Sequence, residues 1–236
     1  MVPSSERMGK GKGAKVRSMP RIHALPTRHS HRADTLAAAT QHLSTADERM
    51  AELIGRIGPC GLKREPGGFA QVFREILSQQ LSGKAAATIR GRILAACGGR
   101  ATPERVLALP DRAFAEAGVS RPKTRYLRAL AETVRDDPRF FERLPKLSDE
   151  AAMERLTSLL GIGRWTAEMY LIFSLGRLDV LPLGDVSILA ASAELHGIAR
   201  SRILRRLPRL AEAWRPYRSV AVWYLYAHLD SKRPRQ

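Results

Sequence analysis

The sequence is poor in the residue types that mark several protein classes. It contains only two cysteines, Cys60 and Cys97, among 236 residues. Two thiols cannot build a disulfide scaffold, a four-cysteine zinc site or a cysteine-ligated iron–sulfur cluster. We therefore expect no iron–sulfur cluster and a reducing compartment. No metal site and no other cofactor are predicted either. The longest unbroken apolar run, residues 220–227, has eight residues, whereas a membrane-spanning helix needs about 20, so no membrane span is predicted.

Acidic residues are also scarce relative to basic ones. The chain has 23 Asp and Glu against 40 Lys and Arg, which gives a formal net charge of +17 and a pI near 10.9. An excess of this size favours a polyanionic partner. Nucleic acid is the first expectation and an anionic membrane surface is the second.

Residues 1–35 differ from the rest of the chain. They carry eight basic and two acidic residues and three of the six histidines, without an apolar period. Such a segment cannot bury enough apolar surface to offset its chain entropy, so we predict a basic disordered tail. It lacks the apolar stretch of a signal peptide. The expected location is the cytoplasm (nucleoid) of a bacterial cell or the nucleus of a eukaryotic one. The tail is either an arm that contacts phosphates or a solvated extension.

Alternating, strand-like patterns are rare in the remaining chain. Only residues 178–183 have an extended pattern, and Pro182 argues against a central strand there. Apolar residues instead recur at three- and four-residue steps, which is typical of amphipathic helices. The clearest such segments are 46–57, 68–79, 123–136 and 149–159. The predicted fold class is all-α.

One short segment, residues 159–167 (LLGIGRWTA), indicates a specific function. Two glycines around one aliphatic residue make a tight turn that a DNA backbone can approach closely. A helix then begins at about Arg164, and its first N–H groups suit a phosphate. The alternative is an ordinary turn whose glycines only cap helices. The residues predicted to form a DNA-binding hairpin are Leu160, Gly161, Ile162, Gly163, Arg164 and Thr166.

The full string resembles the helix–hairpin–helix of the DNA glycosylase superfamily, L-x-G-[IV]-G-x-x-T-A. Asp185 follows Gly163 by 22 residues, as the superfamily's catalytic Asp does at about this spacing. Residues 76–86 (ILSQQLSGKAA) and 214–219 (WRPYRS), with Trp223, resemble motifs of the alkylation-repair branch. Over residues 45–229 the chain is identified as a member of the DNA-3-methyladenine glycosylase II family, in a compact form without the N-terminal mixed α/β domain.

The resemblance makes Asp185 the catalytic residue. A carboxylate beside C1′ stabilises the positive charge that builds on the sugar as the base departs. Without the motif, an Asp after Gly and before a helix is usually an N-cap, and the two roles are compatible. Asp179 and Glu168 are the nearest competing acids. We expect Glu168 to make an ordinary contact on the helix surface.

The residue at position 165 decides the subclass. Relatives that also cut the strand have a Lys there, which attacks C1′ as an amine. Trp165 cannot do so, so the resemblance implies a monofunctional enzyme without lyase activity. It also places Trp165 in the base pocket, with Met169 where some relatives have another aromatic residue. Tyr217 is the third predicted pocket residue; Trp214 and Trp223 belong either to the same wall or to the core.

Reaching a base requires flipping its nucleotide out and filling the gap. The resemblance puts this wedge in the turn at 79–82, with Gln80 and Leu81 as candidates.

We therefore expect a monomeric, two-lobed helix–hairpin–helix glycosylase domain over residues 36–236. One lobe spans residues 80–184, and the other joins 36–79 to 185–236. Double-stranded DNA with alkylated bases lies across the cleft that contains Asp185. The alternatives are a glycosylase for uracil, deaminated or mismatched bases, a non-catalytic DNA-binding module, and a basic RNA- or ribosome-binding helical protein.

Overall fold

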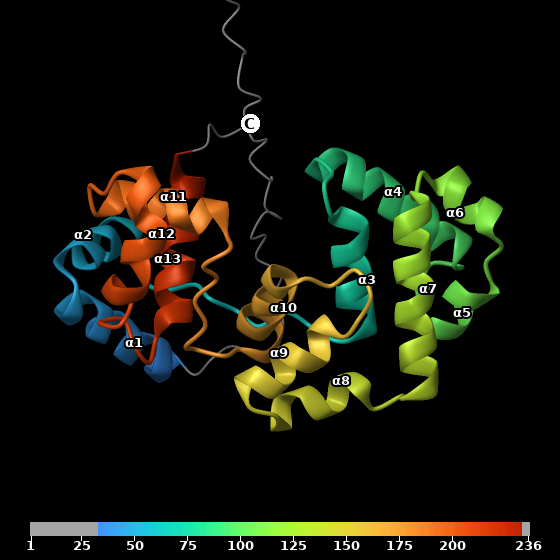
Figure 1. Ribbon diagram of the computed structural model, residues 1–236, viewed down its shortest axis with the longest axis horizontal. Helices are drawn as coiled ribbons and strands as arrows, with labels where there is room; N and C mark the ends of the chain where they lie inside the picture. The colour runs from blue at the N-terminus through green and yellow to red at the C-terminus, as the bar shows by residue number, and fades with distance from the viewer. Residues whose placement is uncertain (1–32, 233–236) are drawn as a thin grey trace, which may run out of the picture.

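A computed structural model describes residues 33–232 of the chain, and these residues are helical almost throughout (Figure 1). No β-strand occurs among them, and the segment 178–183 is a loop, so the all-α prediction is confirmed for the described residues. The predicted tail lies outside them, except that residues 33–35 already belong to the first helix. No helix between residues 33 and 232 is long and apolar enough to cross a membrane.

Five helices from the two ends of the described chain form one group, which we call the terminal lobe. α13 runs through its centre and contacts α1, α2 and α11, while α12 packs on α11. Residues 220–226 of α13 are all buried, which explains why this segment is apolar on every side. The members are α1 (Ala33–Ala46), α2 (Glu48–Ile57), α11 (Val186–Leu195), α12 (Arg200–Leu210) and α13 (Arg218–Ser231).

The middle of the chain forms the second group, which we call the central lobe. α7 is its longest helix and packs against α3 and α5, while α4 packs against α3 and α6. A 3-10 turn (Leu144–Lys146) follows α8, and a π-helical turn (Leu171–Leu175) follows α10. The helices are α3 (Phe69–Ser78), α4 (Gly83–Ala96), α5 (Pro103–Ala108), α6 (Asp111–Ala117), α7 (Arg121–Asp136), α8 (Phe140–Arg143), α9 (Asp149–Thr157) and α10 (Arg164–Tyr170).

The predicted helices match α2, α3, α7 and α9 to within a few residues. The start of α9 is marked by Ser148, whose hydroxyl accepts from the amide of Ala151 at 3.2 Å. The predicted lobe boundary needs one correction. Residues 69–78 are expected in the terminal lobe, but α3 packs against α4 and α7. An amphipathic pattern shows that a helix has a buried face, but not which neighbour covers it.

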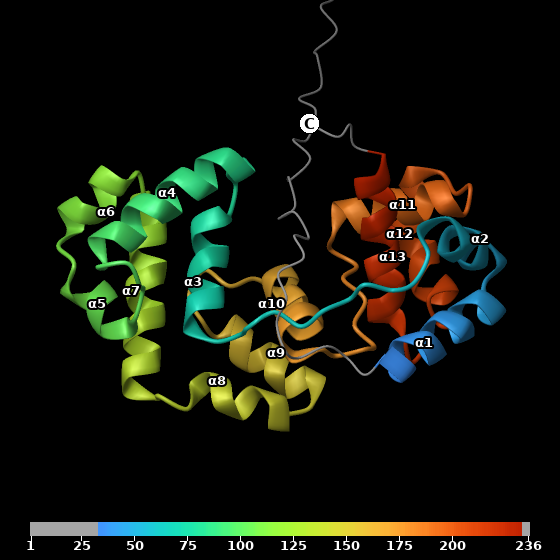
Figure 2. The same cartoon turned by 180° about the vertical axis from the view of Figure 1, so that it is seen from behind.

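Two connections, residues 58–68 and 176–185, join the lobes and run close to α10 (Figures 1 and 2). The first is fixed to the end of α10: the amide of Gly68 donates to the hydroxyl of Tyr170 at 2.7 Å. The second is fixed to α13, where the guanidinium of Arg218 pairs with Asp179 at 2.7 Å. α10 therefore lies on the side of the central lobe that faces the terminal lobe, and the loop that leads to Asp185 has a defined course.

Candidate active site

Asp185 lies at the N-cap of α11, and its carboxylate is almost completely buried, with 5% of the residue exposed. Its Oδ1 accepts hydrogen bonds from the amides of Ser187 at 2.7 Å and Ile188 at 3.0 Å. These amides belong to the first turn of the helix and have no partner inside it. The N-cap role considered from the sequence is therefore present, and it uses only one of the two oxygens.

The second oxygen, Oδ2, faces the other elements of the site. It accepts a hydrogen bond from the hydroxyl of Tyr226 on α13 at 2.8 Å. It accepts another from the indole Nε1–H of Trp165 on α10. The carboxylate thus joins the helix that follows the hairpin to two helices of the terminal lobe.

Tyr226 is a site residue that the sequence reasoning missed. Burial, and then the charge of Asp185, raise the pKa of its phenol well above the ordinary value of 10.0, so the hydroxyl stays protonated and remains a donor. The Tyr226 oxygen also lies 3.4 Å from the sulfur of Met169. Trp165, Met169, Tyr226 and Asp185 therefore form one cluster. The only available sequence signal was a hydroxyl-bearing ring inside the apolar run at 220–227.

Tyr217, the third predicted pocket residue, does not join this cluster. It precedes α13, and its ring packs edge-on against His42 of α1, with centroids 5.4 Å apart. Nine residues separate it from Tyr226, which is about 13 Å along a helix. Trp214 is completely buried and donates to Asp47 at 2.7 Å. Trp223 is also buried, so both tryptophans belong to the core of the terminal lobe.

The two hairpin glycines have different surroundings. Gly161 has φ +85°, and a Cβ there would lie 2.4 Å from the ring of Tyr126. Gly163 has an ordinary φ of −87°, and a Cβ at this position would meet no atom within 4 Å, so its surface is open. Ile162 is buried, whereas Leu160, the other aliphatic residue predicted in the hairpin, is 55% exposed. Leu160 is therefore a surface residue beside the turn.

Side chains of the first turns of α10 follow a mixed pattern. Arg164 is exposed, and its Nε donates to Oε1 of Glu168 at 3.0 Å. Glu168 was expected on the surface, but only 3% of it is exposed, and this burial raises the pKa of its carboxyl above the ordinary value. Thr166, predicted among the DNA-binding residues, is 8% exposed and so offers little surface to DNA. Arg164 and Glu168 are one turn apart on the same face of α10, and this face is exposed at position 164 but buried at position 168.

Asp179, the other competing acid, serves a structural role. Its carboxylate pairs with Arg215 and Arg218, each at 2.7 Å. Of the wedge candidates, Gln80 is exposed and Leu81 is half-buried. Both lie in the turn between α3 and α4, as predicted; their role as wedge stays a prediction.

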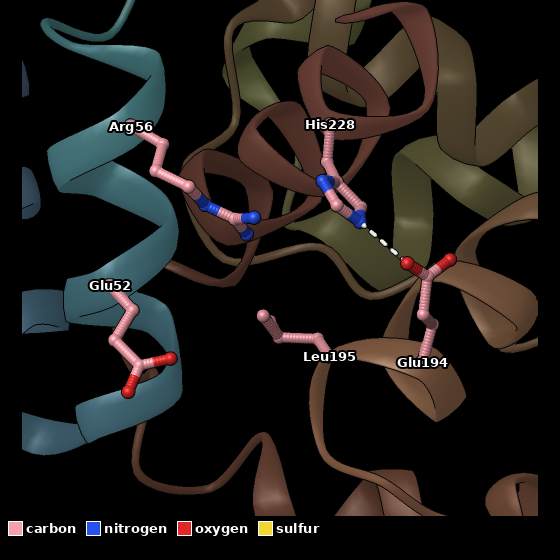
Figure 3. A pocket seen from close by; sticks show the side chains of 5 residues that line it. All are labelled: Glu52, Arg56, Glu194, Leu195 and His228. Atoms are coloured by element: carbon pink, nitrogen blue, oxygen red, sulfur yellow. Dashed lines mark ion pairs between the residues drawn. The ribbon is translucent and has the colours of Figure 1, made fainter. Parts of the chain in front are cut away.

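A separate pocket of about 520 Å³ lies on the terminal lobe (Figure 3). Glu52 and Arg56 project into it from α2, opposite Glu194 and His228, whose Oε1 and Nε2 atoms lie 3.4 Å apart. None of the predicted site residues lines it. Within residues 33–232, no three His, Cys, Asp or Glu side chains gather in a way that could hold a metal ion.

Comparison with known proteins gives the family. Residues 73–216 match the model of the HhH-GPD superfamily of base excision DNA repair proteins. The chain is 35% identical to DNA-3-methyladenine glycosylase 1 of Schizosaccharomyces pombe, over 81% of this chain and 87% of that protein. It is 32% identical to the alkylbase DNA glycosidase-like protein mag2 of the same yeast, over 80% and 91%.

Solved structures agree with this result. The DNA-3-methyladenine glycosidase of Bacillus halodurans superposes with a TM-score of 0.74 at 35% identity, covering 83% of this chain and 91% of that one. The S. pombe 3-methyladenine DNA glycosylase Mag1 in complex with abasic DNA gives 0.68 at 33% identity, covering 80% and 95%. The match to the family model and the identity to these relatives show that the chain belongs to the HhH-GPD superfamily of base excision DNA repair proteins.

Proposed function

We propose that this protein is a monofunctional DNA glycosylase that hydrolyses the N-glycosidic bond of alkylated purines, of the 3-methyladenine and 7-methylguanine type, in base excision repair. The observation that carries the proposal is the buried Asp185 carboxylate, held beside the indole of the helix–hairpin–helix. The names of the two yeast relatives and of the Bacillus structure support the reaction and the class of base.

The hydrogen bonds around Asp185 favour an electrostatic role. An ionised carboxylate has about four acceptor positions, and the amides of Ser187 and Ile188, with Trp165 and Tyr226, occupy four. A water molecule can therefore donate a hydrogen bond to the Asp185 carboxylate only if one of these four donors moves away. In the present geometry the carboxylate therefore acts by its charge, stabilising the oxocarbenium-like sugar as the base leaves. An already cationic purine is a good leaving group and needs no second carboxyl as general acid.

The base pocket in this proposal is formed by Trp165 and Met169. The hydrogen bond to Asp185 fixes the edge of the half-buried Trp165 indole, and in this proposal the purine stacks on that ring. A cationic purine on such a face gains about 1–2 kcal/mol from cation–π attraction. Met169 supplies a polarizable, flexible wall in place of a second aromatic ring.

The side chain at position 165 supports the monofunctional assignment. Trp165 stands where a lyase has its lysine, and an indole forms no imine. Lys123 lies on α7, the helix whose Tyr126 ring packs beneath the hairpin. Its ammonium binds the end of α3 rather than the Asp185 cluster.

The test uses methylated duplex DNA. We expect free 3-methyladenine and 7-methylguanine to be released and detected by chromatography. On a gel, the strands should stay intact until alkali is added, and borohydride should trap little covalent complex. Efficient nicking without alkali, with a trapped adduct that disappears when one lysine is replaced, would contradict the monofunctional assignment. Failure to release any base would contradict the proposed function itself.

A further inference from the structure

The turn between α3 and α4 has an unusual backbone. Gln80 has φ +59°, which is uncommon for a residue other than glycine, and its side chain is exposed. The next residue, Leu81, is half-buried, and both residues line a cavity of about 210 Å³ together with Lys123. Such a backbone conformation persists only where its surroundings hold it. The turn therefore leaves Gln80 more exposed to solvent than Leu81.

Lys123 on α7 supplies part of those surroundings. Its Nζ donates to the carbonyl oxygen of Leu77 at 2.7 Å and to that of Gln79 at 2.6 Å. Carbonyls at the end of a helix lack partners within it, and a cation is favourable there. Burial lowers the pKa of the Lys123 ammonium, so the position is occupied at some cost in solvation. The ammonium therefore links a carbonyl of the last turn of α3, that of Leu77, to the carbonyl of Gln79, the first residue after the helix.

Gln79 connects this turn to the hairpin. Its Nε2 donates to the carbonyl oxygen of Gly161 at 3.0 Å. Below the same glycine lies Tyr126, in the space that a Cβ would occupy. Tyr126 and Lys123 are three residues apart on α7, so they lie on one face of that helix. A single helix thus supports both the hairpin and the turn that carries Gln80.

We propose that Lys123 and Gln79 are positioning residues that fix the Gln80 turn relative to the hairpin. The inference rests on the proposed function. When the hairpin holds the DNA backbone, the contacts from Lys123 and Gln79 set the place at which Gln80 enters the duplex. Neither residue touches the base or the sugar. Their effect is on the opening of the duplex, and the bond-breaking step is left to the Asp185 cluster.

The experiment compares two substrates and three variants. The first substrate is a duplex with one 7-methylguanine opposite cytosine. The second has a tetrahydrofuran spacer opposite the lesion, so that less stacking and pairing must be broken before the nucleotide flips. Lys123→Met keeps the alkyl stem and removes the donor, and Gln79→Met removes the second contact. Lys146→Met is the matched control, because Lys146 is an exposed lysine elsewhere on the central lobe.

On the paired substrate, we expect Lys123→Met and Gln79→Met to slow single-turnover base release at saturating enzyme by about tenfold or more, the effect of about 1.4 kcal/mol. On the spacer substrate the loss should shrink to about threefold or less, and Lys146→Met should match the wild type on both. A merely structural role would slow both substrates equally, and that result would overturn the inference, as would wild-type rates for both variants. If Lys123→Met does not fold, Gln79→Met decides alone. Failure of the proposed function is distinct, because the wild type would then release no base.

Discussion

A single carboxylate serves two purposes through its two oxygens. Oδ1 of Asp185 caps α11 through two backbone amides, whereas Oδ2 binds the side chains of Trp165 and Tyr226. Asp185 could be predicted because an Asp after Gly184 is a helix-start signal and its distance from the hairpin fits the motif. Tyr226 could not, because its contact with Asp185 spans 41 residues and its own neighbours are those of a core helix.

Replacing Tyr226 with Phe tests the donor to Oδ2. A hydrogen bond to a charged group contributes about 1.5–3 kcal/mol, so base release at saturating enzyme should fall about 10- to 100-fold. Tyr224→Phe is the matched control. Tyr224 lies on the same helix, but its hydroxyl donates to the carbonyl of Gly58 at 3.0 Å. The Tyr224→Phe substitution should lower the free energy of unfolding by about 1 kcal/mol and leave the rate of base release within about twofold of the wild-type rate. Equal losses of activity in both variants would remove Tyr226 from the site.

The hairpin has the most specific sequence motif in the chain, but the motif did not predict which of its side chains are buried. The string LLGIGRWTA indicated a turn followed by a helix, and α10 begins at Arg164 as expected. The pattern treats its two glycines alike. The structure separates them, because only Gly161 has a positive φ and a ring beneath it. Exposure of Leu160 and burial of Glu168 depend on the neighbours of the hairpin, which a local pattern does not contain.

Alanine substitutions at the two glycines should therefore affect different properties: stability at position 161 and DNA binding at position 163. Gly161→Ala forces a left-handed conformation that costs about 1–2 kcal/mol for an L-residue, and its Cβ would collide with Tyr126. We expect a lower melting temperature. Gly163→Ala meets nothing within the protein, so the melting temperature should stay close to the wild-type value. Its methyl group would instead occupy space needed by the DNA backbone, and the affinity for undamaged duplex should fall.

Thermal unfolding and fluorescence anisotropy with a labelled duplex measure the two quantities. A Gly163→Ala variant that binds DNA as well as the wild type would show that the backbone does not approach this turn. A Gly161→Ala variant with an unchanged melting temperature would contradict the packing of Tyr126 on the hairpin.

In the whole molecule, the site is built where the two lobes meet. Trp165 and Met169 come from α10, whereas Asp185 and Tyr226 come from α11 and α13 of the terminal lobe. The all-α class and most of the long helices follow from apolar periodicity. The division into lobes was less predictable, as α3 shows, because packing partners are set by the complete arrangement of helices. Tyr217 shows the same limit: the motif indicated the region around the last helix, but not that the ring of Tyr217 packs on His42 of α1.

The most direct test of the account is base release from methylated DNA by the Asp185→Asn variant. Asn is as good an N-cap as Asp, so its carbonyl oxygen can keep the two backbone amides of α11, and the variant should fold and bind DNA. The variant loses the negative charge of the carboxylate that stabilises the sugar cation. The rate of base release at saturating enzyme should therefore fall at least about 100-fold, as when a single donor to a developing charge is removed. Circular dichroism and duplex binding verify the fold. Release of base by the folded variant at close to the wild-type rate would contradict the central role of Asp185.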